Sequence, residues 1–546
     1  MRILGVNAVF HDPAAALVID GQVVAAAEEE RFSRRKHGKQ AVPFATWELP
    51  VAAIRWCLEH AGVAAEEIDA IGYSYDPALM YDEPVDPAGL DKDWEYLRTL
   101  YAERAPGFLK TALPGLNPAV VQHVRHHVAH AASTALASPH PDTAVLVVDG
   151  RGERTSMLAG AYRDQKLDVL AAQQLPHSLG LLYESLTEHL GFVRSSDEYK
   201  VMAMASYGRP CFADQLRDRV YACDDGGFRT EPIDWERLAP RRRADTTDLD
   251  PVHADLACSV QLVIEEVLLD LVRWLRARTD GDALCLAGGV ALNCVANSRI
   301  YAEGGFGRVW VQPAAGDAGT ALGAALSLAA SFHEPITPMP TAQLGRGWSE
   351  ERMRAALDDA AVRYERPDDV ATAVGDALAK NQLIGWFQGR AEFGPRALGG
   401  RSLLADPRHP ANLERLNAVK GREQFRPVAP MVLAERAAEI FTRGPLPSPY
   451  MLFVHDVAEN WRGRIPAVTH VDGTARIQTV DKAEHPLLHA TISHFAEHTG
   501  VPVVVNTSFN TAGRPMVDTP RDALEVFGSS PIDVLALGPY LVRRYL

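Results

Sequence analysis

The stretch RILGVNAVFHDPAAALVIDGQVVAAA (residues 2–27) decides the fold prediction for the first half of the chain. Two turns interrupt it, one with His11 and Asp12 and one at Asp20-Gly21. The apolar runs around these turns are 3–6, 14–19 and 22–27. Short apolar runs bounded by turn residues are typical of strands, and Asp-Gly between two such runs is typical of a tight hairpin. We therefore predict three consecutive strands.

A second stretch, AVLVVDGRGERTSMLAGAYRDQKLDVLA (residues 144–171), repeats this pattern. Its apolar runs are 145–148, 156–162 and 167–171. Two such three-strand units, about 140 residues apart and each followed by helix-like sequence, predict a duplicated α/β domain with a cleft between its halves. This is the layout of the actin, Hsp70 and sugar-kinase (ASKHA) superfold. Two unrelated β-meanders are the alternative.

Two glycine-rich turns occur further along this domain. One contains Gly288 and Gly289 and is followed by Asn293, and the other, at Gly316 and Asp317, opens a helix of small residues. Glycines at a helix N-terminus expose backbone N–H groups to a phosphate. We predict that these five residues form a nucleotide site. Glycine turns that serve only close packing are the alternative.

The composition is that of a globular, enzyme-sized chain, with 546 residues and a net charge of −15. Such a length accommodates several domains. An acidic surface repels phosphate backbones, so we expect no nucleic-acid partner. No apolar run approaches the roughly 18 residues that span a membrane, and no two of the six cysteines form a C-x-x-C pair. We expect a cytoplasmic protein without a membrane partner or zinc ribbon, with a homodimer as its candidate assembly.

A change in composition predicts the boundary between two domains. Prolines, threonines and glycines accumulate over residues 331–350, which is typical of a linker. The expected domains are therefore 1–343 and 344–546. The second domain is smaller and also α/β, with strands expected at 383–387 and 502–505.

Three histidines in five residues (126–130) form the first chemical motif. If this segment is helical, His126 and His130 lie one turn apart on the same face, which is the spacing that lets two imidazoles bind one metal ion. Asp149 and Asp317 are the expected third and fourth ligands. Nitrogen and oxygen ligands without thiolates favour iron, manganese or zinc. Histidines on the polar face of a surface helix are the alternative.

Arginines between glycine and proline turns form the second motif, over residues 389–402 and 420–427. Guanidinium groups bind phosphate bidentately, and rigid turns hold them at fixed separations. This pattern predicts a pocket for a small phosphorylated substrate, and Asn506 and Ser508 after the strand 502–505 suit a nucleotide's phosphate or sugar. Solvated surface arginines and a simple loop are the alternatives. The candidate cations of this pocket are Arg396, Arg401, Lys420, Arg422 and Arg426.

Eight motifs follow one another along the chain: FHD (10–12), EEERFSRRKH (28–37), HHVAH (126–130), VDGRGE (148–153), YKVMAMA (199–205), AGGVALN (287–293), GPRALG (394–399) and NTSFN (506–510). In this order they resemble the O-carbamoyltransferases of antibiotic and nodulation-factor biosynthesis. The resemblance covers nearly the whole chain. It implies an N-terminal domain like the tRNA-threonylcarbamoylation ATPase (Kae1-like) and a C-terminal domain like the YrdC-like enzyme that makes threonylcarbamoyl-adenylate.

The resemblance also implies a reaction. The C-terminal domain takes carbamoyl phosphate, releases carbamate and joins it to ATP, with Mg²⁺, as carbamoyl-adenylate. In the N-terminal domain a hydroxyl of the acceptor, a natural product, attacks the carbonyl of this adenylate.

The site residues carried over by these motifs fall into three groups. His126, His130, Asp149 and Asp317 match iron ligands. The carbamoyl phosphate and ATP site is matched by Arg396, Lys420, Arg422 and Arg426, with Arg476 and Ser508. His11 and Lys36 match residues near the transferred carbonyl, and His11 is the candidate base; a histidine that only orders its turn is the alternative.

Other functions use similar folds. A tRNA-modifying enzyme is disfavoured by the net charge, and an enzyme that carbamoylates a protein thiol would carry paired C-x-x-C motifs. A non-catalytic nucleotide-binding scaffold is a third alternative. The sequence leaves the acceptor open, whether glycoside, macrolide or other polyketide. We expect its pocket to be lined by segments 72–115 and 209–250, where Tyr81, Trp94 and Tyr101 lie.

Overall fold

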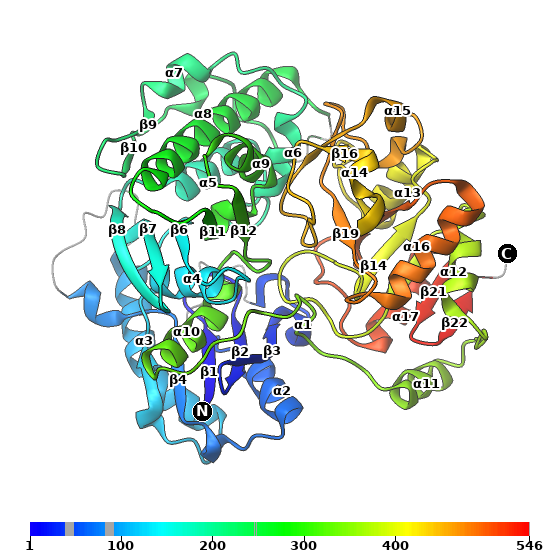
Figure 1. Ribbon diagram of the computed structural model, residues 1–546, viewed down its shortest axis with the longest axis horizontal. Helices are drawn as coiled ribbons and strands as arrows, with labels where there is room; N and C mark the ends of the chain where they lie inside the picture. Colours follow the sequence, from blue (N-terminus) through cyan, green and yellow to red (C-terminus); the bar gives the residue numbers. More distant parts are fainter. Residues whose placement is uncertain (39–47, 82–91, 245, 247, 545–546) are drawn as a thin grey trace. The chain divides into compact units, whose positions relative to one another are not determined.

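The computed structural model describes residues 1–38, 48–81, 92–244, 246 and 248–544 (Figure 1). The chain forms two compact units, Met1–Pro340 and Thr341–Leu546. In the described ranges, no helix is both long and apolar enough to cross a membrane.

The first sheet of Met1–Pro340 has five strands in the order β3-β2-β1-β4-β5. Strand β1 pairs antiparallel with β2 and parallel with β4, and the outer pairs are antiparallel β2–β3 and parallel β4–β5. The strands are β1 (Arg2–Asn7), β2 (Ala14–Ile19), β3 (Gln22–Glu28), β4 (Ala70–Tyr73) and β5 (Val121–His123). The three strands predicted from residues 2–27 are therefore confirmed.

The second sheet repeats the first. Its order is β8-β7-β6-β11-β12, with antiparallel pairs β6–β7 and β7–β8 and parallel pairs β6–β11 and β11–β12. Its strands are β6 (Thr143–Val148), β7 (Thr155–Arg163), β8 (Lys166–Gln174), β11 (Ala283–Ala287) and β12 (Arg308–Val311). Because order and direction match strand by strand, the duplicated α/β fold is confirmed and the alternative of two unrelated meanders is excluded.

Two helices occupy equivalent places in the two halves. Helix α4 (His126–Ala135) follows β5, the last strand of the first sheet, and α10 (Ala318–Ser331) follows β12, the last strand of the second. Helix α10 packs against α4, β1, β2 and β4.

The remaining elements of this unit cover the sheets or lie between them. Helix α2 packs on β2 and β3, and α6 and α9 pack on the long apolar helix α8. These elements are α1 (Glu30–Ser33), α2 (Val51–Ala61), α3 (Lys92–Ala112), α5 (Leu179–His189), α6 (Glu198–Ala205), α7 (Ala213–Arg217), α8 (Pro251–Arg276), α9 (Cys294–Glu303), β9 (Val220–Ala222) and β10 (Phe228–Thr230).

The unit Thr341–Leu546 is built on a seven-stranded mixed sheet in the order β19-β15-β20-β14-β13-β21-β22. Its strands are β13 (Ile384–Phe387), β14 (Arg401–Ala405), β15 (Ala429–Leu433), β19 (Gln478–Val480), β20 (Val503–Ser508), β21 (Val534–Leu537) and β22 (Tyr540–Arg543), and a small sheet holds β16 (Phe441–Thr442), β17 (His455–Val457) and β18 (Thr474–Ala475). Its helices are α11 (Glu350–Asp359), α12 (Val370–Ala379), α13 (Ala411–Val419), α14 (Ala437–Ile440), α15 (Glu459–Arg462), α16 (Pro486–Thr499) and α17 (Pro520–Ser529).

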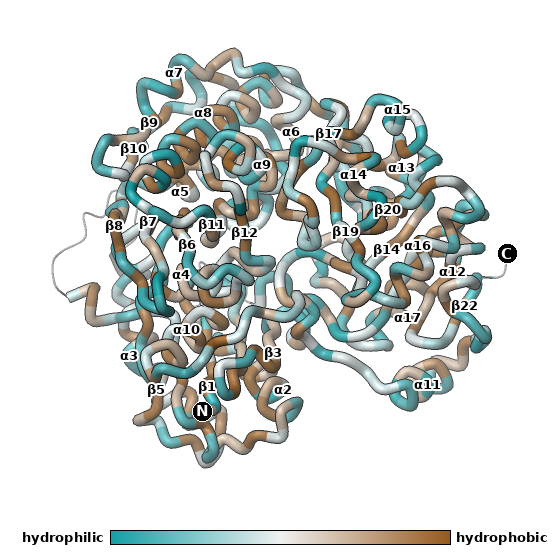
Figure 2. The backbone as a smooth tube through the Cα atoms, viewed as in Figure 1, coloured by the Kyte–Doolittle hydropathy of each residue, from teal (hydrophilic) through white to brown (hydrophobic). Residues whose placement is uncertain are grey.

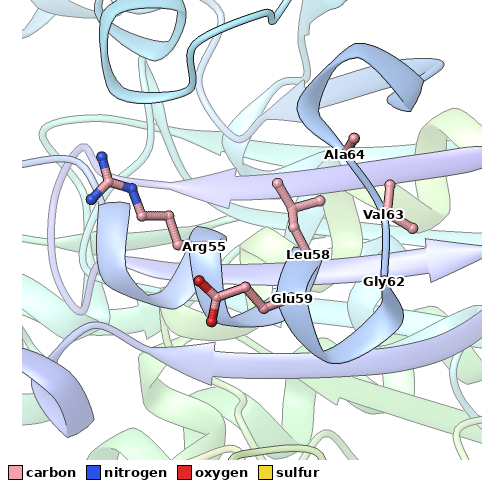
Figure 3. A pocket seen from close by; sticks show the side chains of 6 residues that line it. All are labelled: Arg55, Leu58, Glu59, Gly62, Val63 and Ala64. Carbon is pink, nitrogen blue, oxygen red and sulfur yellow. The ribbon is translucent and has the colours of Figure 1, made fainter.

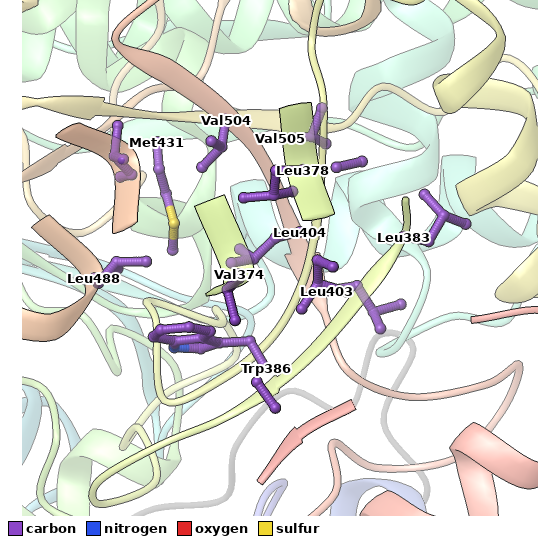
Figure 4. Close-up of a cluster of buried hydrophobic side chains, with 14 of the residues drawn as sticks. Val374, Leu378, Leu383, Trp386, Leu403, Leu404, Met431, Leu488, Val504 and Val505 are labelled. Atoms are coloured by element: carbon purple, nitrogen blue, oxygen red, sulfur yellow. The ribbon is translucent and has the colours of Figure 1, made fainter. Parts of the chain in front are cut away.

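Apolar side chains of these central strands form the core of the second unit. Figure 4 shows Trp386, Leu403, Leu404, Met431 and Val504 converging, and all five are buried. Along the chain, the hydrophobic stretches in Figure 2 follow buried elements such as β3 and α8. Burial of this surface supplies the main favourable term for folding.

The contact of α10 with its neighbours depends on glycine. A Cβ atom on Gly5 would stand 1.7 Å from the carbonyl oxygen of Ala321, and one on Gly72 would stand 2.7 Å from that of Ala324. On α10 itself, a Cβ on Gly323 would stand 1.7 Å from the carbonyl oxygen of Ala129 in α4. The helix therefore lies directly on the backbones of β1, β4 and α4.

This packing generates the first prediction. Gly5→Ala should destabilise the protein by about 1–3 kcal/mol or more, because the new methyl group meets backbone that cannot rotate away. As a control, a Cβ on Gly107 in α3 would meet no atom of the described residues within 4 Å beyond its own helix backbone, so Gly107→Ala should stabilise by up to about 1 kcal/mol through helix propensity. Thermal unfolding followed by circular dichroism measures both. Equal melting of Gly5→Ala and the parent protein would contradict the described contact.

Candidate functional site

Helix α4 presents two buried histidines on one face. His126 and His130 are both fully buried and lie one helical turn apart, as their spacing predicts. The carboxylate of Glu153 accepts a hydrogen bond of 2.8 Å from the backbone N–H of His126 at the start of the helix. A carboxylate at this end of a helix is favoured by the helix dipole. Glu153 therefore fixes the place where the histidine face begins.

Two aspartates face these histidines. Asp149 follows β6 and Asp317 precedes α10, and one carboxylate oxygen of each points toward both rings. The distances from Nε2 of His126 are 3.5 Å to Asp149 and 3.6 Å to Asp317, and those from Nε2 of His130 are 3.7 and 3.6 Å. These separations are too long for good hydrogen bonds. Ligands about 2.1 Å from a four-coordinate ion stand about 3.4 Å apart, so the separations suit an ion shared by all four groups.

The second carboxylate oxygen of each aspartate is held by a backbone N–H. Gly289 donates to Oδ1 of Asp149 at 2.8 Å, and His11 donates to Oδ2 of Asp317 at 3.0 Å. The carbonyl of Ser74 lies 3.2 Å from Nδ1 of His126 and can only accept, so Nδ1 carries a hydrogen and Nε2 is the nitrogen that a metal ion would bind.

The donor set fits a metal ion. Within the described part of the chain, the buried Nε2 atoms of His126 and His130 have no hydrogen-bond partner, and the four ligand atoms lie within 4.8 Å of one another. Burial lowers the pKa of both rings, but the carboxylates of Asp149 and Asp317 outweigh burial and raise it. This group of two imidazoles and two carboxylates could hold a divalent cation.

The third histidine of the motif has a structural role. The ring of His127 is hydrogen-bonded through Nδ1 to the hydroxyl of Thr155 at 2.7 Å, and burial lowers its pKa to about 3. It packs against Gly152, where a Cβ atom would stand 2.6 Å from Nδ1. His127 therefore ties α4 to the β6–β7 turn.

His11 and Lys36, the two predicted catalytic residues, lie in one network. Nδ1 of His11 and Nδ1 of His37 are 2.9 and 3.0 Å from the two carboxylate oxygens of Asp12. The hydroxyl of Ser196 lies 2.8 Å from Nε2 of His37 and 3.1 Å from Nζ of Lys36. Sequence reasoning missed Asp12, His37 and Ser196, although two of them adjoin the predicted residues in the FHD and RKH motifs.

The electrostatics of His11 follow from its neighbours. Burial lowers the pKa of His11, but the carboxylates of Asp12 and Asp317 outweigh burial and raise that pKa to about 9. The part due to Asp317 is lost when a cation neutralises that carboxylate.

The predicted nucleotide residues of this unit have mostly internal roles. Gly288 (φ 91°) passes against the carbonyl of Val148, and Gly289 binds Asp149. The side-chain amide of Asn293 caps α9 and exchanges hydrogen bonds with Gln261. Gly316 is the exception, because a Cβ there would meet only Leu292 at 3.8 Å. These turns end β11 and begin α10, next to the two aspartates.

In the second unit, Lys420 is the centre of the predicted cation pocket. Its buried ammonium donates to the carbonyl and hydroxyl of Ser508 at 2.6 and 2.8 Å and to the side-chain oxygen of Asn510 at 2.5 Å. Burial lowers the pKa of Lys420 well below its usual value, and the charges of Arg422 and Arg426 lower it further. The structure thus brings Lys420, Arg422, Arg426 and Ser508 together.

Two further cations lie on segments held at the same sheet. Arg396 precedes Ala397 and Leu398, whose carbonyls accept hydrogen bonds from Asn506 of β20 and Gln478 of β19. Arg476 lies two residues before Gln478 and close to His470.

Arg401 and Asn506 are buried and bind mainly groups of the protein itself. The guanidinium of Arg401 is fully buried over the ring of Phe387 at 3.8 Å, and it donates to the carbonyls of Gln388, Gly389, Gly400 and Arg346. Asn506 is buried, and its side-chain amide donates hydrogen bonds to the carbonyl of Ala397 and to the side-chain oxygen of Gln478. Through these hydrogen bonds both residues hold the loop that carries Arg396.

Glu392 is a further loop residue that sequence reasoning missed. One buried carboxylate oxygen accepts hydrogen bonds from the N–H groups of Leu398, Gly400 and Arg401. No spacing rule signals this role, because it depends on how the loop folds back on itself.

Segment 72–115, one of the two predicted to line the acceptor pocket, touches the histidine–aspartate group at Ser74, whose carbonyl lies 3.2 Å from Nδ1 of His126. A surface hollow of about 380 Å³ at the end of α2 is lined by Arg55, Leu58, Glu59, Gly62, Val63 and Ala64 (Figure 3), none of which is a predicted site residue. The segments predicted to bind the acceptor fall partly outside the described residues, at 82–91, 245 and 247. Tyr81 is exposed, and the ring of Tyr101 packs on Phe108.

Comparison with known proteins agrees with the predicted resemblance. The chain is 37% identical to the uncharacterized protein sll1178 of Synechocystis, over 100% of this chain and 97% of that protein. It is 38% identical to the nodulation protein NolNO of Sinorhizobium fredii, over 98% and 80% of the two chains. The solved structure of HypF from T. kodakarensis shares 15% identity, with a TM-score of 0.38 over 62% of this chain and 48% of that one.

Two family models cover both units. Residues 2–326 match the carbamoyltransferase N-terminus, and residues 375–544 match the carbamoyltransferase C-terminus. The first match alone exceeds half of the chain, and the relatives above align over nearly all of it. The protein therefore belongs to the carbamoyltransferase family of enzymes.

Proposed function

We propose that the protein is an ATP-dependent O-carbamoyltransferase that makes carbamoyl-adenylate and transfers its carbamoyl group to a hydroxyl of a natural product. The observation that carries this proposal is the buried group of His126, His130, Asp149 and Asp317, set beside His11 in the unit that matches the family's N-terminal model. A divalent ion held by these four groups would polarise the carbonyl of an acyl phosphate.

The activation step is assigned to Thr341–Leu546. Carbamoyl phosphate loses phosphate to water and leaves carbamate, whose oxygen attacks the α-phosphorus of Mg²⁺-bound ATP and displaces pyrophosphate. Lys420, Arg422 and Arg426 lie close together, and Ser508 and Asn510 orient the amino group of Lys420, whose charged form a bound polyanion would favour. Phosphate oxygens compensate charges that otherwise repel one another, so this cluster is prepared for a polyanion. Arg396 and Arg476 are the further phosphate ligands that we propose.

The transfer step is assigned to Met1–Pro340. The acceptor hydroxyl attacks the carbonyl carbon of carbamoyl-adenylate, a new C–O bond forms, and AMP leaves as the bond from carbon to the phosphate oxygen breaks. The unprotonated form of His11 takes the hydroxyl proton on Nε2, and Lys36 stabilises the developing negative charge. We place the adenylate at the Gly288–Gly289 and Gly316 turns. An iron-type ion held by the two histidines and two aspartates would supply Lewis acidity.

Two separate sites suit the chemistry of the intermediates. Carbamate is unstable, and an acyl-adenylate is destroyed by water, so each step needs a protected site. The competing functions are carbamoylation of tRNA, carbamoylation of a protein thiol and a scaffold that binds nucleotide without catalysis. Product analysis by mass spectrometry with ATP, carbamoyl phosphate and a panel of hydroxylated natural products decides among them.

The buried histidines generate a prediction about metal. Purified protein should contain about one iron-type ion per chain, since the site offers one set of four ligands. The variant His126→Ala/His130→Ala should lose it in elemental analysis. The matched control is His494→Ala/His498→Ala, which removes another i, i+4 pair that lies near Asp376 on the surface of the second unit. If His126→Ala/His130→Ala kept its full metal content, or if His494→Ala/His498→Ala lost its metal, the ion would not be bound at His126 and His130.

A second prediction concerns the arginines. Arg396→Lys or Arg426→Lys keeps the charge but loses the bidentate fork, which costs about 1–3 kcal/mol in a desolvated site. The apparent affinity for carbamoyl phosphate should therefore fall about ten- to a hundredfold. The exposed Arg363, changed to Lys, serves as control. If both pocket variants kept wild-type kinetics, we would conclude that these arginines do not bind the substrate.

A third prediction separates the half-reactions. His130→Ala or His11→Asn should still release phosphate and pyrophosphate but carbamoylate little acceptor, because these residues serve the transfer step. Arg422→Ala or Arg426→Ala should lose both activities and recover transfer when synthetic carbamoyl-adenylate is added. Each variant must first show the parent's melting profile. If well-folded Arg422→Ala and Arg426→Ala did not recover transfer with synthetic carbamoyl-adenylate, the two-site assignment would be wrong, and a single composite site would take its place.

A further inference from the structure

The carboxylate of Asp12 joins two histidines that are distant in the sequence. One oxygen is 2.9 Å from Nδ1 of His11 and the other is 3.0 Å from Nδ1 of His37. The two rings lie 4.3 Å apart between centroids, and all three side chains are half-buried. These distances are those of hydrogen bonds. Asp12 is therefore shared equally by both rings.

The backbone at this point is held in an unfavourable conformation. Asp12 (φ 43°) and His37 (φ 62°) both lie in the left-handed region, which non-glycine residues rarely adopt. The buried amide of Asn7 donates to the carbonyls of His11 and Asp12 at 2.7 and 3.0 Å. The carboxylate of Glu30 accepts from the backbone N–H of His37 at 2.8 Å. Two separate side chains thus maintain the strained geometry, which indicates that the placement of Asp12 and His37 matters.

The donor and acceptor roles of these groups set the direction of each hydrogen bond in the network. A carboxylate only accepts, so Nδ1 of both histidines must donate to Asp12. When Nδ1 carries the single ring hydrogen of His37, Nε2 is an acceptor, and the hydroxyl of Ser196 donates to it at 2.8 Å. The oxygen of Ser196 in turn accepts from Nζ of Lys36 at 3.1 Å. A continuous chain runs from Lys36 through Ser196, His37 and Asp12 to His11, whose Nε2 makes no hydrogen bond within the described ranges.

We propose that Asp12, His37 and Ser196 are positioning residues that hold Lys36 and His11 as one unit for carbamoyl transfer. This inference rests on the proposed function and adds three residues to it. Asp12 fixes the tautomer and the direction of the His11 ring, so that Nε2 faces the hydroxyl whose proton it takes while that oxygen bonds to the carbamoyl carbon and AMP leaves. Ser196 and His37 hold the ammonium of Lys36 at a fixed distance from that ring.

Kinetics test the positioning role on the full chain. The assay follows carbamoyl-glycerol formed from synthetic carbamoyl-adenylate with glycerol as the hydroxyl probe. Asp12→Asn should lower kcat at least about tenfold with little change in KM, since replacing the orienting carboxylate of a hydrolase triad costs about 10⁴-fold. Pyrophosphate release in the activation step should not change. His37→Asn should lower kcat less, and the double variant should be no slower than Asp12→Asn.

The exposed residue His333 also has a left-handed backbone (φ 59°), so His333→Asn is the matched control for His37→Asn. Unchanged kcat in Asp12→Asn, or effects of Asp12→Asn and His37→Asn that multiply, would overturn the proposal. A wild-type protein that forms no product would instead contradict the proposed function. Chemical labelling of His37 then tests the hydrogen-bond network independently of catalysis.

Chemical labelling tests the network without catalysis. Diethyl pyrocarbonate acylates unprotonated imidazole nitrogen, and Nε2 of His37 is covered by Ser196. Ser196→Ala should raise the labelling rate of His37 about fivefold, which is the effect of losing one hydrogen bond. Cleavage at glutamate releases residues 31–48, which contain His37 as their single histidine. Ser206→Ala, which loses only a bond to its own helix, is the control. An unchanged rate in Ser196→Ala would show that the chain is broken at Ser196.

Discussion

The site depends on the close crossing of α10 with α4. Gly323 of α10 lies so near α4 that a Cβ atom would stand 1.7 Å from the carbonyl of Ala129. Ala129 directly precedes His130, and α10 begins directly after Asp317. This contact therefore sets how far the aspartate of one helix stands from the histidines of the other. A larger residue at the crossing would push the two helices apart. The separations of 3.5–3.7 Å between the histidine nitrogens and the aspartate oxygens would then increase.

The duplication explains why four ligands meet at one point. Asp149 lies in the first turn of the second half, and His11 and Asp12 lie in the corresponding turn of the first half. The histidines of α4 and Asp317 of α10 occupy the helices that follow the last strand of each sheet. In a pair of equivalent α/β halves, such positions face a common cleft. The two halves then diverged, since one first turn carries the candidate metal ligand Asp149 and the other carries His11, the proposed proton acceptor.

Hydrogen bonds to backbone groups give both units their preorganisation. Each aspartate divides its two oxygens between a backbone N–H and the histidine rings. In the second unit, Glu392 and Arg401 bind the backbone of the same loop. Glu392 accepts hydrogen bonds from its N–H groups, and Arg401 donates hydrogen bonds to its carbonyls. Groups fixed in this way need not reorganise when charge develops during a reaction. The carbamate and carbamoyl-adenylate of the proposed reaction would make such a requirement stringent.

Local spacing in the sequence determined the strands, the duplication and the shared face of His126 and His130, because period and turn chemistry act over a few residues. The motifs also indicated Asp149, Asp317, His11, Lys36 and Lys420. Only the tertiary structure decided which groups of the protein the predicted phosphate ligands bind. Arg401 and Asn506 carry the chemistry of phosphate ligands, yet their partners are carbonyls of a loop that folds back on them. Asp12, His37 and Ser196 become one network only because segments 160 residues apart meet at a hydroxyl, a contact that folding sets and local sequence does not encode.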